Sequence, residues 1–183
     1  AIYLSDDIEV SDVLKIHAGL RYSSFQHAGK IRLKNYLLNE ITFSNDNYRH
    51  IEPRLSARYF INPTTSIKCS YTENFQYIHL ANTSSVSLPT DLWVPSSSKI
   101  EPKHSTQYAI GYFKNFNDNM YEFSSEAYYK DMTNLIEYKE GMLPEDNTNT
   151  TSDNSFNFGI GDSYGIELLL KKDKGKTTGW IGY

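Results

Sequence analysis

Glu122 and Glu126 are two carboxylates four positions apart, a spacing that raises the question of acid–base catalysis. On one face of a β-strand they would lie roughly 13 Å apart, because each residue advances the chain by about 3.3 Å. A glycosidase needs its two carboxyl groups about 5 to 9.5 Å apart. Since no nucleophile and base can be paired elsewhere in the sequence, we expect a protein that is not an enzyme.

The possible metal ligands are scattered along the chain. Cys69 is the only cysteine, so the sequence holds neither a disulfide framework nor a cysteine-based zinc site. No two histidines stand in a His-x-x-x-His or comparable motif, and a metal site needs several ligands that converge. We expect no metal and no cofactor, and interpret the histidines as residues of loops or of an interior surface: His17, His27, His50, His79 and His104.

A predicted connection at 75–103 combines aromatic rings with polar groups. Its prolines and a serine cluster argue against a central strand there. The aromatic rings could stack on a flat or sugar-like substrate. In the alternative interpretation, Trp93 and its prolines only pack the connection against the rim of the structure. The candidates for substrate binding are Tyr77, His79, Asp91 and Trp93.

The elements that would position these residues are β-strands. In 52–71, apolar and polar side chains alternate on both sides of the turn Asn62-Pro63-Thr64, which predicts an antiparallel hairpin with one apolar and one polar face. In a soluble sheet the polar face would contact water. In a membrane barrel the apolar face contacts lipid and the polar face lines the lumen. The lumen-lining candidates are Arg54, Arg58, Lys68, Glu122, Glu126 and Glu167.

The lengths of the connections decide between these two interpretations. Short turns at 12–13, 62–64, 117–119 and 173–176 alternate with long connections at about 24–47, 75–103 and 133–161. Outer-membrane barrels have short periplasmic turns and long extracellular loops in strict alternation, which a sandwich lacks. We therefore predict an all-β, antiparallel up-and-down meander of about eight strands, belonging to a barrel of about 22 strands.

The composition agrees with this class of protein. Aromatic residues make up 14% of the chain, which favours strands over helices. No run of about 18 apolar residues, the length of a spanning helix, is present. The net charge of −4 gives no electrostatic reason to expect nucleic acid as a partner.

Several segments resemble the barrel of TonB-dependent outer-membrane receptors, particularly those of Bacteroidetes. The hairpin strands at 52–59 and 66–71 carry the resemblance first, and 88–95 continues it in the long connection. Glu-Ala-Tyr-Tyr-Lys at 126–130 and the strands at 163–167 and 178–183 complete the order and spacing. The resemblance covers most of the chain from about residue 18 onward.

This resemblance implies the function and the setting. Such receptors are barrels of about 22 strands occluded by an N-terminal plug, and they import scarce substrates with energy from TonB. We expect 1–183 to be a single segment of that barrel in the cell outer membrane, without the plug that contacts TonB. The partners would be TonB through the plug region, membrane lipid, and a small-molecule, glycan or peptide substrate.

Two further expectations concern the chain taken by itself. A secreted β-sandwich module that binds carbohydrate through Trp93 and Tyr77 is the alternative to the transporter. An isolated barrel segment would carry open strand edges and a lipid-type face, so we expect it to associate with itself.

Overall fold

The computed structural model describes residues 1–32, 41–81, 92–139 and 155–183. Ten β-strands form two sheets, and within the described residues no helix is long and apolar enough to cross a membrane. The strands are β1 (Ile2–Ser11), β2 (Leu14–Arg32), β3 (Ile41–Asn62), β4 (Thr65–Gln76), β5 (Ile78–Ala81), β6 (Leu92–Pro95), β7 (Lys103–Phe116), β8 (Tyr121–Tyr138), β9 (Phe156–Lys172) and β10 (Gly179–Gly182).

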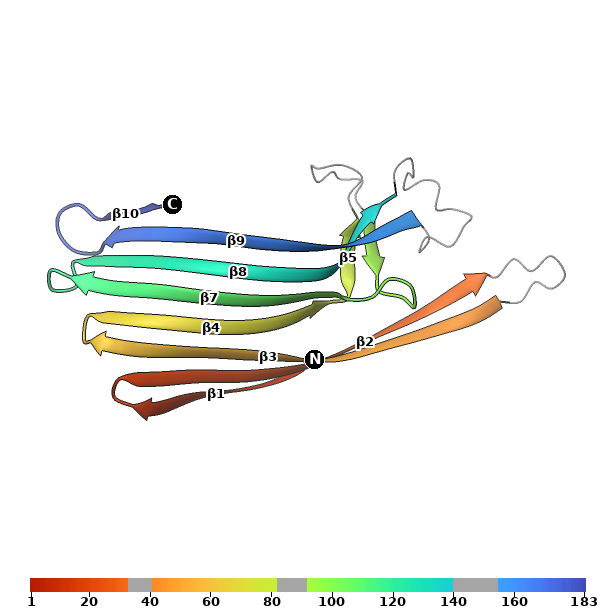
Figure 1. The fold of residues 1–183 in the computed structure, drawn as a ribbon, viewed down its shortest axis with the longest axis horizontal. Coiled ribbons are helices and arrows are strands. Elements are labelled where there is room, and N and C mark those ends of the chain that lie inside the picture. The colour runs from red at the N-terminus through yellow and green to blue at the C-terminus, as the bar shows by residue number, and fades with distance from the viewer. Residues whose placement is uncertain (33–40, 82–91, 140–154) are drawn as a thin grey trace.

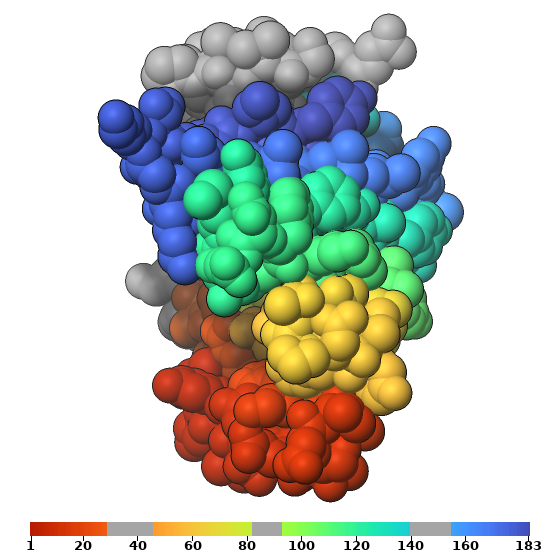
Figure 2. Space-filling view, turned by 90° about the vertical axis from the view of Figure 1, so that its left-hand side faces the viewer, coloured from red at the N-terminus to blue at the C-terminus, as the bar shows by residue number. Residues whose placement is uncertain are grey.

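The larger sheet is the predicted meander. Its eight strands follow one another in the order β1-β2-β3-β4-β7-β8-β9-β10, and every neighbouring pair is antiparallel. The short turns lie at one end of the strands and the long connections at the other (Figure 1). Seen from the short-turn end, the segments succeed one another from the N-terminal to the C-terminal strands (Figure 2). The predicted fold class is thereby confirmed.

The short turns use residues suited to reversing the chain. In the β3–β4 turn, the backbone N–H of Thr64 donates to Asn62 Oδ1 at 3.0 Å, as in an Asx-turn. The β7–β8 turn places Asn117, Asp118 and Asn119 at φ values of 54°, 54° and 57°, a region that Asn and Asp tolerate better than other side chains. These turns set the register of the hairpins on either side.

The predicted lengths of two long connections are wrong. β2 and β3 remain paired as far as Arg32 and Ile41, where 24–47 was expected to be a connection. Likewise β8 continues to Tyr138 and β9 begins at Phe156. The expected ends of the strands rested on the alternation of apolar and polar residues. This alternation fades in 23–32 and 41–51, although the backbone pairing of β2 and β3 continues there.

The register gives the larger sheet two distinct faces. We call the side that carries Leu55 the apolar face. Its side chains form cross-strand rows, one of which runs from Leu55 through four tyrosines on successive strands: Tyr71, Tyr108, Tyr129 and Tyr164. Leu55 is 50% exposed and Tyr164 is 77% exposed. The described residues include no second sheet that covers this face.

The buried hydrophobic core lies at one end of the molecule. It consists of Ala81, Val94, Ile100, Tyr138 and Phe156, from the β5–β6 region and the adjoining ends of β8 and β9. A β-sandwich would bury the apolar face between two packed sheets. Because Leu55 and its row stay uncovered and the core forms elsewhere, the structure contradicts the sandwich alternative.

Candidate functional site

The predicted lumen residues of the larger sheet gather on the side opposite the apolar face, which we call the polar face. Arg58 pairs with Lys68 across β3 and β4, and the same row continues through Gly111 to Glu126 and Glu167. Arg54 and Glu122 lie an even number of residues from this row on their strands, so they share its face. The structure thus brings all six predicted lumen residues to one side of the sheet.

The charges within this row are segregated. Lys15 pairs with Arg58, so β2, β3 and β4 each contribute a cation at the same level. β8 and β9 contribute two carboxylates, Glu126 and Glu167, directly opposite each other. On the cationic side, the Arg58 guanidinium lies over the Phe113 ring, 5.1 Å from its centroid. At the N-terminal edge Glu9 of β1 pairs with Lys15, so the row runs from one carboxylate through three cations to two carboxylates.

The three loop candidates that the structure describes separate in space. Tyr77 points into the structure: its hydroxyl lies 2.5 Å from Ser23 Oγ and 3.0 Å from His50 Nδ1, and its ring stacks on Phe25 at a centroid distance of 5.2 Å. Burial raises the pKa of Tyr77, which keeps the hydroxyl protonated. Tyr77 therefore anchors the connection to the β2–β3 hairpin.

His79 and Trp93 lie on opposite sides of the small sheet. His79 is 3% exposed, and its Nε2 lies 3.1 Å from Ser96 Oγ. Burial, helped by the positive charge of Lys103, lowers the pKa of His79 and favours the neutral ring. Trp93 pairs with Leu80 and is 63% exposed. Asp91 lies outside the described residues. Of the three described candidates, Trp93 alone presents most of its surface to solvent.

Sequence reasoning missed a buried polar cluster beside Tyr77. Glu52 is 1% exposed, its Oε1 accepts a hydrogen bond of 2.5 Å from Ser23 Oγ, and its Oε2 lies 3.9 Å from the Arg21 guanidinium. The His50 ring stacks on Phe75 at 3.8 Å. The register of β2 and β3 pairs Arg21 with Glu52, but the paired register of β3 and β4 ends at Arg54, so cross-strand spacing could not predict the contacts that reach Tyr77 and Phe75. The available signal was the density of aromatic and histidine residues in 48–50 and 75–79.

The described residues contain no group of three or more His, Cys, Asp or Glu side chains that could hold a metal ion. Glu73 and His104 form a close pair, with Oε1 and Nε2 2.9 Å apart. The Phe75 ring packs beside the pair, 4.5 Å from the His104 centroid. This arrangement supplies two possible ligands, fewer than a structural metal site requires.

An antiparallel meander with one continuous exposed apolar face and one charged face is the wall of an outer-membrane β-barrel. The family model described as "TonB dependent receptor-like, beta-barrel" matches residues 1–182. The chain belongs to this family, whose members are outer-membrane receptors and transporters and not enzymes. Family membership bears out the expected outer-membrane location and the expected absence of an enzymatic reaction.

Several solved structures share the fold. The alcaligin outer-membrane receptor FauA of Bordetella pertussis gives a TM-score of 0.59 at 18% identity, over 99% of this chain and 29% of the receptor chain. The pyoverdine receptor FpvA of Pseudomonas aeruginosa gives a TM-score of 0.60 at 17% identity, over 99% of this chain and 24% of the receptor chain. The ferric-catecholate import receptor Fiu of E. coli gives a TM-score of 0.59 at 11% identity, over 98% of this chain and 27% of the receptor chain. No curated protein sequence matches the chain.

The present chain spans less than a third of the length of these receptor chains. At 11–18% identity the likeness concerns the fold of the barrel wall.

Proposed function

We propose that this chain forms part of the barrel wall of a TonB-dependent receptor of the Bacteroidetes type. The receptor binds a scarce extracellular substrate and imports it into the periplasm with energy from TonB. In this proposal, residues 1–183 are one segment of a barrel of about 22 strands. The plug, and with it the contact to TonB, belongs to another part of the receptor.

The single observation that carries the proposal is the division of the sheet into two faces. The tyrosine row beginning at Tyr71 and the aliphatic residues beside it are exposed on one side, while the row of Arg58 and Glu126 lies on the other. A free water-soluble sheet would leave this apolar side unprotected. Lipid on one side and a wet lumen on the other satisfy both faces.

We propose that the six predicted residues of the polar face, Arg54, Arg58, Lys68, Glu122, Glu126 and Glu167, line the lumen. Among the loop candidates, the exposed Trp93 ring is suited to stack on a substrate at the extracellular mouth. Tyr77 and His79 would support the loop from behind, because their polar atoms are engaged inside the structure. Asp91 stays a candidate for the same mouth.

The substrate class follows from uptake measurements on the whole receptor. The related structures carry the names of alcaligin, pyoverdine and ferric-catecholate receptors, so ferric chelates are the first class to test, followed by cobalamin, glycans and peptides. We expect the receptor to fractionate with the outer membrane, to give a heat-modifiable band, and to take up its substrate only in cells that contain TonB. A soluble secreted protein without such a band would contradict the proposal.

We also propose that the isolated segment associates with itself. β1 and β10 are the outer strands of the eight-stranded sheet and offer unpaired backbone groups. The apolar face adds exposed residues such as Ile110 and Ile166, which are 54% and 64% exposed. Light scattering on residues 1–183 refolded from denaturant should show oligomers. A strictly monomeric, soluble species would contradict this expectation.

A further inference from the structure

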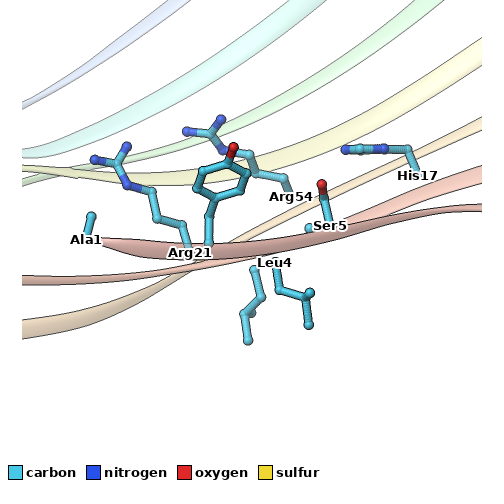
Figure 3. Close-up of a pocket in the computed structure, with 9 residues that line it drawn as sticks. Ala1, Leu4, Ser5, His17, Arg21 and Arg54 are labelled. Atoms are coloured by element: carbon cyan, nitrogen blue, oxygen red, sulfur yellow. The ribbon is translucent and has the colours of Figure 1, made fainter.

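A pocket of about 460 Å³ opens on the polar face near the N-terminal edge of the larger sheet. Arg21, Arg54, Ser5 and His17 project from the same side of β1, β2 and β3, whereas Leu4 points to the opposite side (Figure 3). The lining is mixed: these four polar residues share it with Tyr3, the register partner of Arg21, and with Ala1, Leu4, Gly19 and Leu20.

A glycine at the base of the pocket leaves space there, because it has no side chain. In the register, Gly19 lies between Ser5 on β1 and Arg54 on β3. A Cβ atom added at Gly19 would lie 3.6 Å from Ser5 Cβ and 3.7 Å from Arg54 Cβ, in ordinary contact with both. A larger side chain at this position would stand in the space between Arg54 and β1.

The two arginines are diagonal neighbours across β2 and β3. Gly19 pairs with Arg54 and Arg21 pairs with Glu52, so Arg21 and Arg54 are offset by two residues. Diagonal neighbours of this kind lie about 7–8 Å apart at the backbone, which is within reach of long side chains. One small anion can therefore contact both guanidinium groups.

The positive charge of the pair is only partly compensated. Arg54 donates to the neutral amide of Asn74, with Nη2 3.1 Å from Oδ1. Arg21 lies 3.9 Å from Glu52 Oε2, too far for a hydrogen bond. Asp7, the acidic residue next to the pocket, lies 2.8 Å from His17 Nδ1. The N–H donors of the two arginines point into an open pocket, and their positive charge is only partly compensated. They are therefore suited to bind an anion.

We infer that Arg21 and Arg54 form an anion clamp in the barrel wall and that its ligand is a carboxylate group. A guanidinium presents parallel N–H donors that match the two oxygens of a carboxylate. The carboxylate comes either from a substrate that passes through the lumen or from an acidic side chain of the receptor that occupies the lumen. The inference rests on the proposed function, because it places this face inside the barrel.

Chemical footprinting of the purified full-length receptor tests the clamp and separates the two sources. Phenylglyoxal modifies accessible arginines, and mass spectrometry measures the rate at each residue with and without citrate as the carboxylate probe. Arg49 is the internal reference, because it is exposed on β3 and its register position places it on the opposite face. Shielding of Arg21 and Arg54 that appears only with citrate indicates a clamp open to substrates.

Shielding without citrate that disappears in about 1 M sodium chloride, where the Debye length falls to about 3 Å, indicates a carboxylate of the receptor itself. Two results overturn the inference. One is that both arginines react as fast as the reference Arg49 both with and without citrate, and the other is shielding that persists in high salt, since that reports packing and not an ionic contact.

Variants give an independent measurement. If the clamp is open to substrates, Arg54→Gln should weaken citrate binding by at least about tenfold, the scale of one charge-assisted hydrogen bond. Arg54→Lys keeps the positive charge but loses the paired N–H donors of the guanidinium. Its citrate affinity should lie between that of Arg54→Gln and that of the native receptor. Arg49→Gln should bind citrate as the native receptor does. If the receptor supplies the carboxylate, Arg54→Gln should instead expose Arg21 to phenylglyoxal.

The heat-modifiable band confirms that each variant folds. Citrate binding that is unchanged in Arg54→Gln, together with unchanged reactivity of Arg21, would overturn the clamp. A failure of the proposed function gives a different result. The heat-modifiable band would then be missing, because this face would lie outside a barrel, while citrate would still shield the arginines.

Discussion

Near the short turns, the apolar face of the larger sheet exposes large side chains such as Tyr59, whereas near the long connections Tyr138 of β8 and Phe156 of β9 are buried beneath β5 and β6. Tyr59 at the first end is 52% exposed, and Phe156 at the second end is 2% exposed. In the first region, lipid covers the apolar side chains that a protein core would otherwise bury. In the second region, which we place outside the membrane, the loops must form a core of their own.

The comparison explains why the two ends of one strand carry different sequence patterns. Where lipid covers one face, every second residue must be apolar, and a charge there is costly. Where β5 and β6 pack on the ends of β8 and β9, packing selects individual residues. On β3 the polar Glu52 is likewise buried with a specific partner, Ser23. The two regions should therefore respond differently to the same kinds of substitution.

The largest expected effect is in the loop core. Phe156 packs against Tyr138 with ring centroids 4.8 Å apart. Phe156→Ala should destabilise this region by about 3–5 kcal/mol, the usual cost of removing a buried aromatic ring. Hydrogen exchange of β5 and β6 in the intact receptor measures the loss. Phe158→Ala, two residues further along β9 at a site 50% exposed, is the matched control and should change exchange much less.

The next effect distinguishes the two faces of the sheet. Ile110 is exposed on the apolar face, and its neighbour Ala109 lies on the polar face. Ile110→Arg should destabilise the barrel by about 2–4 kcal/mol if this position lies near the bilayer midplane. Ala109→Arg should cost clearly less, because its side chain enters the lumen. Urea unfolding in lipid vesicles compares the two, and equal losses would contradict the assignment of the faces.

A smaller effect is expected where the loop is anchored to the β2–β3 hairpin. Tyr77→Phe removes the hydroxyl that contacts Ser23 and His50 but keeps the ring on Phe25. The loss should be about 0.5–1.5 kcal/mol, typical of one hydrogen bond. The rate of proteolysis within 77–102 reports it. An unchanged rate would show that the ring alone holds the loop.

The smallest effect is a pH dependence confined to the loop. Burial lowers the pKa of His79 below its ordinary value of 6.5. The unfolded loop then binds the proton more readily than the folded loop, so the stabilisation from neutral His79 is complete above about pH 6.5 and declines as the pH falls. Proteolysis of 77–102 should accelerate between pH 7.5 and 5.5. His79→Gln should remove most of this pH dependence.

The two regions also mark how far the sequence could predict the molecule. Alternation and turn residues predicted β1, the β3–β4 hairpin and the turn at Asn117, because lipid and water impose a period of two there. The same pattern placed the six lumen candidates on one face. It could not predict the parts of β2 and β3 in 23–32 and 41–51, where apolar and polar residues do not alternate.

Nor could the pattern predict the anchoring of Tyr77. The contact joins residues 23, 50 and 77, which are distant in sequence and lie where the paired register of β3 and β4 has ended. Contacts of this kind depend on how the connection folds back, and local periodicity carries no information about that.

The most direct test of the two-faced wall uses the native cysteine. Cys69 lies on the apolar face beside Ala57 and Ile110, and the next residue, Ser70, lies on the polar face beside Ser56 and Ala109. A nitroxide attached at Cys69, or at Ser70→Cys in a Cys69→Ala background, is measured by power-saturation electron paramagnetic resonance with the receptor in bilayers. We predict that lipid-soluble oxygen relaxes the label at 69 more strongly than a water-soluble nickel chelate does, and that this preference is absent or reversed at 70. The same preference at both positions, or a preference for the nickel chelate at 69, would contradict the account.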